Sequence, residues 1–176
     1  MSTRGHVAIK EDGKYKYIYN HHDSYIDGVG ITLYKWYQDV NKVRKLIALG
    51  NTSSIGYTVE EGGSKSYAEH LNKPVEQRGT VATFRDINRW TDCSETTEWE
   101  DEKPMETENL SEVLGQEFTY IFDTEDSRWY FAYRDDGYRL RDLEETLHSK
   151  KVLEKLFCGI YRKECLPGFY KRCLEA

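Results

Sequence analysis

The chain has 176 residues, a length typical of one domain with its own core. Aromatic residues make up 14% and charged residues 32%, which excludes a disordered chain because disordered chains are poor in aromatics. No apolar run approaches the ~18 residues that span a bilayer, and the first residues lack the apolar core of a signal peptide. We therefore expect one cytoplasmic domain over residues 1–176.

The net charge of −6 is distributed unevenly along the chain. Residues 92–112, called the acidic segment below, hold nine carboxylates and one cation, so they carry −8 and leave +2 on the other residues. A segment of this charge repels nucleic acid and attracts basic surfaces, which argues against general nucleic-acid binding. Residues 150–172 are basic, with seven cations and two carboxylates.

The first third of the chain predicts a hairpin and two helices. Residues 5–19 alternate around an Asp-Gly pair, which supplies the positive φ angles of a tight hairpin turn. Apolar residues recur at helical spacing from Tyr25 to Tyr37. Asp39 is the expected N-cap of a second helix, and Gly50 is expected to end it. The next residues, NTSSIG, are expected to form a turn.

The remaining chain predicts three more strands. Residues 79–86 alternate as in a strand, and the acidic segment after them is expected to be a long surface loop or a partial helix. Residues 117–124 and 128–135 have the clearest strand patterns and predict a second hairpin.

Apolar spacing between residues 140 and 166 predicts one or two helices, ended by Pro167 and Gly168. The strands lie too close together for βαβ crossovers. We therefore expect an α+β fold with a mainly antiparallel sheet and helices packed on one face. The four cysteines form no CxxC pair, so we expect core thiols in a reducing cytosol and no metal site.

The densest polar cluster, Asn-His-His-Asp-Ser-Tyr at residues 20–25, lies at a predicted junction of strand and helix. Its candidate catalytic residues are His21, His22 and Asp23, because histidine titrates near neutrality and a carboxylate can fix its tautomer. Adjacent strand residues point to opposite faces, so the two histidines are not expected to bind one metal ion together. His6 is placed to meet one of them across the hairpin.

A purely structural role for this cluster is the alternative interpretation. Asp23 or Ser24 would then cap the following helix, and one histidine would pack at the end of the strand.

Arginine and carboxylate residues also lie at the ends of two of the predicted strands. Arg85, Asp86 and Arg134, together with Tyr25, are candidate ligand-binding residues, since arginine suits a phosphate or nucleotide. Surface ion pairs of small energetic value are the alternative. The sequence identifies no cofactor.

The acidic segment supplies candidate partner-binding residues. Nine carboxylates in 21 residues repel one another, but an apolar tryptophan interrupts them. We expect a mobile element that binds a basic partner through five residues: Glu98, Trp99, Glu100, Asp101 and Glu102. A solvated loop whose tryptophan packs on the protein body is the alternative.

The motifs at residues 3–30 and 42–56 resemble a family of small uncharacterised bacteriophage and prophage proteins. That family has a Thr-Arg-Gly start, a (Cys/Asn)-His-x-Asp-(Gly/Ser)-Tyr motif and a Leu-Gly-x-x-Ser-Ser-(Leu/Ile)-Gly turn. Its later Arg-Asp-Arg-Gly-Glu pattern is matched here only by Arg85 and Asp86. The resemblance implies a phage protein in a bacterial cytoplasm and implies no particular chemistry.

Two functions therefore remain open. The first is a phage-encoded protein that inhibits or sequesters a host factor, either a defence or regulatory protein or its signalling nucleotide. The second is a small hydrolase or metal-dependent enzyme built on the His-His-Asp cluster. The sequence predicts neither turnover nor an oligomeric state.

Overall fold

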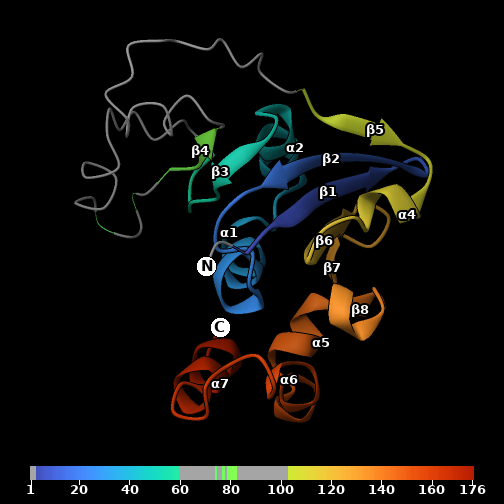
Figure 1. Cartoon of the computed structure of the whole chain (residues 1–176). Coiled ribbons are helices and arrows are strands. Elements are labelled where there is room, and N and C mark those ends of the chain that lie inside the picture. The colour runs from blue at the N-terminus through green and yellow to red at the C-terminus, as the bar shows by residue number, and fades with distance from the viewer. Residues whose placement is uncertain (1–2, 60–73, 75–76, 78, 83–102) are drawn as a thin grey trace, which may run out of the picture.

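The computed structural model describes residues 3–59, 74, 77, 79–82 and 103–176 (Figure 1). These residues form a sheet with the strand order β4-β3-β2-β1-β6-β7-β8, and β5 pairs with β2 outside this path. The strands are β1 (Gly5–Glu11), β2 (Lys14–Asn20), β3 (Thr52–Ser54), β4 (Val81–Ala82), β5 (Met105–Thr107), β6 (Phe118–Asp123), β7 (Arg128–Tyr133) and β8 (Arg141–Asp142).

Both predicted hairpins are confirmed. Strands β1 and β2 pair antiparallel around Asp12 and Gly13, whose φ angles of 50° and 75° are those that the Asp-Gly pair predicts. Strands β6 and β7 also pair antiparallel, with Phe118 opposite Tyr133. Short turns of this kind leave little freedom in register, so the two hairpins fix the centre of the sheet.

The predicted α+β class is confirmed, but the prediction of a mainly antiparallel sheet is wrong, because the sheet is mixed. Strand β1 pairs parallel with β6, and β2 pairs parallel with β3. The two hairpins lie side by side through their first strands, β1 and β6. These strands run in the same direction because β5 runs along the hairpin toward its turn, and α4 then carries the chain back to the start of β1 before it enters β6.

A parallel crossover was missed because residues 52–54 were expected to form a turn. They form β3. The helices between β2 and β3 bring the chain back beside the last residue of β2, where Thr52 pairs with Asn20. A parallel pair needs such a long connection, usually a helical one.

Helices lie between and after the strands. Their bounds are η1 (a π-helix, Ile26–Gly30), α1 (Ile31–Trp36), α2 (Val40–Ala48), α4 (Leu110–Val113), η3 (a 3-10 helix, Arg134–Asp136), α5 (Leu143–Leu147), α6 (Lys150–Phe157) and α7 (Leu166–Leu174). Among the described parts of the chain, no helix is long and apolar enough to cross a membrane.

The helices pack mainly, but not only, on one face of the sheet. Helices α1, α2, α5, α6 and α7 bury apolar residues in one core with alternate residues of β1 and β6, such as Val7 and Tyr120. Helix α4 covers the opposite face, where Val113 packs with Ala8, Tyr17 and Ile121. Strand alternation places these two sets of residues on opposite faces.

The predicted helix ends are confirmed for α2 and wrong for α7. The carboxylate of Asp39 accepts the backbone N–H of Lys42, and Gly50 lies just after α2 with a φ of 80°, as predicted. Pro167 and Gly168 were expected to end the helical region, but they lie in the first turn of α7. Proline suits that position because the first turn has no acceptor for its missing N–H.

The cysteine prediction is correct for one described thiol and wrong for two. Cys173 is buried in the core, whereas Cys158 and Cys165 are exposed. Both exposed thiols lie at helix ends, Cys158 at the end of α6 and Cys165 just before α7, because the predicted single helix is interrupted between them.

Candidate functional site

Four strand ends meet at one end of the sheet. Strands β1 and β6 begin there and β2 and β7 end there, because Gly5 pairs with both Asn20 and Phe118. The residues that flank these strand ends are therefore brought together from distant parts of the sequence. We call this group the histidine end: Arg4, His6, Tyr19, His21, His22, Glu117 and Arg134.

The imidazole and phenol rings of the histidine end form a chain of contacts. His6 lies directly opposite Tyr19 in the register, with ring centroids 6.4 Å apart. Tyr19 and His21 are 5.9 Å apart, and the Tyr19 hydroxyl lies 2.8 Å from Nδ1 of His21. His21 and His22 are 4.5 Å apart and nearly perpendicular. The prediction that His21 and His22 diverge is wrong, because β2 ends at Asn20 and strand alternation stops there.

His6 and His21 are both held toward the neutral form. Nδ1 of His6 lies 2.7 Å from the carbonyl oxygen of Val113, which can only accept, so this nitrogen carries the proton. Burial lowers the pKa of His6, and the hydrogen bond to Val113 opposes this only in part. Burial also lowers the pKa of His21, with smaller contributions from His22 and from the Arg4 cation.

Arg4 is the available cation of the site. It is exposed, and its backbone N–H donates to Oε2 of Glu117 at 3.4 Å, while its guanidinium has no bond to any described residue. Arg134 is more constrained, since its guanidinium lies 3.6 Å from Glu117 and 3.2 Å from Asp135. With no partner in the described part of the chain, the guanidinium of Arg4 can direct its donors to an anion.

A buried hydroxyl lies in the strand that binds the histidine turn. Ser53, in β3, is 7% exposed, and its Oγ has no hydrogen-bond partner among the described residues. Its carbonyl oxygen accepts the backbone N–H of His22 at 2.9 Å, which joins β3 to the turn that carries the histidines. A buried hydroxyl without a partner is costly unless something supplies one.

A hydrogen-bond network holds the turn that carries the histidines. The amide of buried Asn20 donates to the carbonyl of His22 at 2.6 Å and to Oγ of Ser24 at 2.8 Å. Its own oxygen accepts from the hydroxyl of Thr52 at 2.9 Å. These bonds of buried Asn20 fix the turn to β3.

The alternative of a helix cap at Asp23 or Ser24 is wrong, since Tyr25 precedes η1 and makes no side-chain cap bond. Asp23 instead adopts a φ of 57° and its carbonyl oxygen accepts the N–H of Val29 at 3.0 Å. Gly28 permits this contact, because a Cβ at that position would lie 2.5 Å from the Asp23 oxygen. The Asp23 carboxylate is exposed, and the structure shows no bond from it to either histidine.

The other predicted site residues have different placements. Tyr25 packs against Phe118 and Tyr161, at ring distances of 6.0 and 6.3 Å. The candidate ligand residues Arg85 and Asp86 and the candidate partner residues 98–102 lie outside the described residues, so their roles stay predictions. The end of the acidic segment is placed: Glu106 and Glu108 pair with lysines of β2 at 3.1 and 3.3 Å.

Arg4, Tyr19 and Ser53 were not among the predicted site residues. Two signals in the sequence point to them. The hairpin register places Tyr19 opposite His6, and the Thr-Arg-Gly and Ser-Ser motifs of the phage resemblance contain Arg4 and Ser53.

A hollow of about 70 Å³ lies away from the histidine end, between α1 and the β7–β8 pair. Its charged groups form ion pairs with one another. Arg128 lies 2.9 Å from Asp142 and 3.6 Å from Glu144, and the Tyr34 hydroxyl donates to Glu144 at 3.1 Å. The histidine end, whose Arg4 guanidinium is unpaired among the described residues, is the stronger candidate.

The described residues contain no group of three or more His, Cys, Asp or Glu side chains that could hold a metal ion. Comparisons of the chain with protein-family models, with curated proteins and with solved structures found no match. The chemistry of the site therefore has to come from its own geometry.

Proposed function

We propose that the protein binds and sequesters a small anion of the phosphate or nucleotide class at the histidine end of its sheet. The observation that carries this proposal is the Arg4 guanidinium, exposed and unpaired among the described residues, beside the His21–His22 pair. Guanidinium donors match the oxygens of a phosphate.

The biological setting of this proposal comes from the resemblance to phage proteins. A phage protein that captures an anionic signal would inhibit a host defence or regulatory system by lowering the concentration of its signalling nucleotide. Capture requires a fixed site and no turnover, and the Asn20 network fixes the turn that carries the histidines.

Hydrolysis of a phosphate ester is the second candidate. It is favoured by the 2.8 Å contact between the Tyr19 hydroxyl and His21, because an imidazole that stays neutral at pH 7 can act as a general base. The two proposals share one ligand class and differ only in whether the ligand is converted.

Calorimetric titration with inorganic phosphate, AMP and GMP tests the proposal. We expect binding by the wild type and a loss of about ten- to a hundredfold in affinity in Arg4→Gln, since one charge-assisted bond contributes about 1.5–3 kcal/mol. Arg162→Gln is the matched control, because Arg162 is exposed and unpaired among described residues but lies between α6 and α7. No heat for any of the three anions would contradict the proposal.

Phosphorus NMR of the same mixtures separates the two functions. Unchanged nucleotide after prolonged incubation supports sequestration, whereas release of inorganic phosphate from AMP or GMP supports the hydrolase. An equal loss of affinity in Arg4→Gln and Arg162→Gln would show that only the overall charge of the protein matters.

A further inference from the structure

The α6–α7 pair presents cationic side chains that form no ion pair in the described part of the chain. The side chains of five exposed residues on these helices and their connection make no hydrogen bond or ion pair with any described residue: Lys151, Lys155, Arg162, Lys163 and Lys171. We call these five residues the basic surface. Two neighbouring cations do form ion pairs and are therefore left out: Lys150 lies 3.7 Å from Glu154, and Arg172 lies 2.7 Å from Asp27.

Large apolar side chains are exposed among these cations. Ile160, between the two helices, is 44% exposed, and Leu174, at the end of α7, is 37% exposed. A surface for a nucleic acid needs charge and hydrogen bonds to phosphate, whereas protein interfaces combine apolar contacts with a charged rim. The combination here favours a polypeptide that carries both carboxylates and an apolar anchor.

The chain itself contains a segment of this composition. Residues 92–102 hold six carboxylates and no lysine or arginine, and Trp99 lies among the carboxylates. Tryptophan is a frequent anchor in protein interfaces. Opposite charge on the two elements would speed and orient their association.

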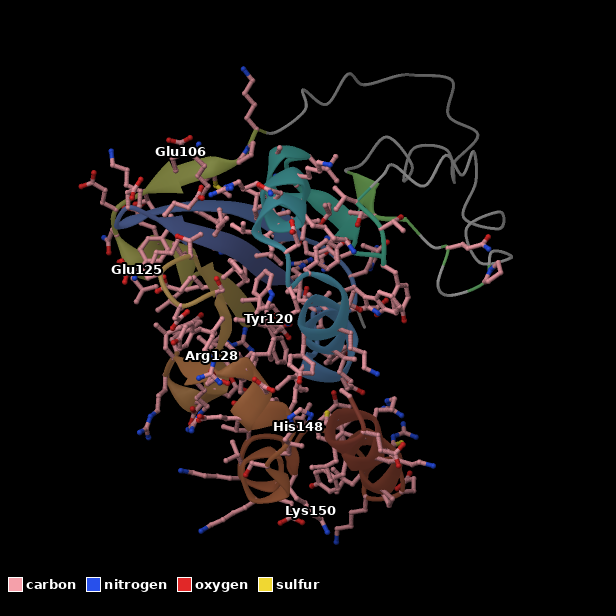
Figure 2. All side chains as sticks on the ribbon, turned by 180° about the vertical axis from the view of Figure 1, so that it is seen from behind. Glu106, Tyr120, Glu125, Arg128, His148 and Lys150 are labelled. Atoms are coloured by element: carbon pink, nitrogen blue, oxygen red, sulfur yellow. The ribbon has the colours of Figure 1, made fainter. Side chains whose placement is uncertain are left out.

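We propose that the basic surface binds residues 92–102 of a second copy of this chain. The end of the acidic segment is attached through β5 to the sheet, and β5 and α6–α7 lie at opposite ends of the molecule in Figure 1. Figure 2 shows the same separation from behind, with Glu106 at one end and Lys150 at the other. A second copy can offer its basic surface without the segment passing around its own sheet. Two reciprocal contacts would close a dimer with two-fold symmetry.

Sedimentation velocity of the full chain over a salt series tests this. We expect a dimer at about 25 mM NaCl. It should dissociate to monomers at about 300 mM NaCl, because salt screens the contacts between exposed charges. A triple variant of the basic surface should weaken association at low salt by tenfold or more, in order-of-magnitude terms: Lys151→Gln, Lys155→Gln and Lys163→Gln. A control of equal charge change, on exposed residues elsewhere that are unpaired among the described residues, should dimerise like the wild type: Lys35→Gln, Lys45→Gln and Arg139→Gln.

Mixing two defective variants gives the sharpest test. A variant with a neutralised acidic segment should also be monomeric: Glu98→Gln, Glu100→Gln, Asp101→Asn and Glu102→Gln. Mixed with the triple variant of the basic surface, it should associate one to one, more weakly than the wild type, because the mixed pair retains one of the two reciprocal contacts.

Three results would overturn the proposal. One is a wild type that stays monomeric at low salt, and another is a dimer that both variant sets leave unchanged. The third is a mixture in which the two variants associate no more than each variant does alone. A salt-dependent change in shape at constant mass would place the segment on its own chain and would also refute binding to a second copy.

Discussion

The hydroxyl of Tyr19 lies 2.8 Å from Nδ1 of His21, and this contact joins the penultimate residue of strand β2 to the residue just beyond the strand. Burial raises the pKa of Tyr19, so the phenol is protonated at neutral pH and can donate to the imidazole. The same hairpin places His6 opposite Tyr19. Protonation of one ring in this chain therefore affects its neighbours.

Acid should destabilise the protein through His6. Its folded pKa is lowered, so the unfolded chain takes up the proton first, and stability that is full above about pH 6.5 is lost as the pH falls below that value. His6→Gln should lose less stability than the wild type between about pH 7 and pH 5. Urea unfolding at both pH values measures this, and equal losses in the two proteins would contradict the assignment.

Asn20→Ala should be strongly destabilising, because the buried amide has three partners and its loss leaves buried polar groups unpaired. We expect a decrease of about 2–4 kcal/mol in the free energy of unfolding. Asn41→Ala is the control, since Asn41 is exposed on α2 and its loss should cost less than about 0.5 kcal/mol. Similar effects in both variants would show that the Asn20 network is not a stabilising element.

Gly28→Ala should disturb the histidine turn by steric contact. The added Cβ would lie 2.5 Å from the backbone oxygen of Asp23, which cannot move without breaking its bond to Val29. We expect a loss of about 1–3 kcal/mol. Gly159→Ala has open space around the new Cβ and should change stability by less than about 1 kcal/mol, so thermal unfolding of the pair isolates the steric effect.

The contact between η1 and α7 depends on a largely buried carboxylate. Asp27, whose side chain is 11% exposed, accepts from Arg172 at 2.7 Å and from the Tyr161 hydroxyl at 2.9 Å. Since the Arg172 side chain is 56% exposed, we expect a coupling energy of about 1 kcal/mol between Asp27→Asn and Arg172→Gln. Urea unfolding of the single and double variants measures it, and additive effects would exclude a direct interaction.

Sequence patterns correctly predicted those turns and helix ends that are determined by a few neighbouring residues. The Asp12-Gly13 turn, the Asp39 cap and the Gly50 stop each depend on a few neighbouring residues, and each is present. The mixed sheet was not predictable in this way. The parallel pairing of β1 with β6 joins segments more than a hundred residues apart, and the three residues of β3 are too few to show a period.

The candidate site was predicted in part, for the same reason. The polar cluster at residues 20–25 predicted His21 and His22 as site residues. The structure brings them to the same end of the sheet as Arg134. Arg4 and Ser53 join them only through pairing between strands, which the sequence does not state. Asp23 appeared to belong to the cluster because it is adjacent in sequence, but the turn directs its carboxylate to solvent.

The central claim, capture of an anion at the histidine end, is tested most directly by NMR of the imidazoles during a phosphate titration. An anion bound beside Arg4 should shift the ring resonances of His21 and His22 and raise the lowered pKa of His21, because negative charge stabilises the imidazolium. The shifts should saturate with phosphate and should be absent in Arg4→Gln, while exposed His148 stays unchanged in both proteins. Resonances of His21 and His22 that do not respond to phosphate, or that respond equally in Arg4→Gln, would contradict the account.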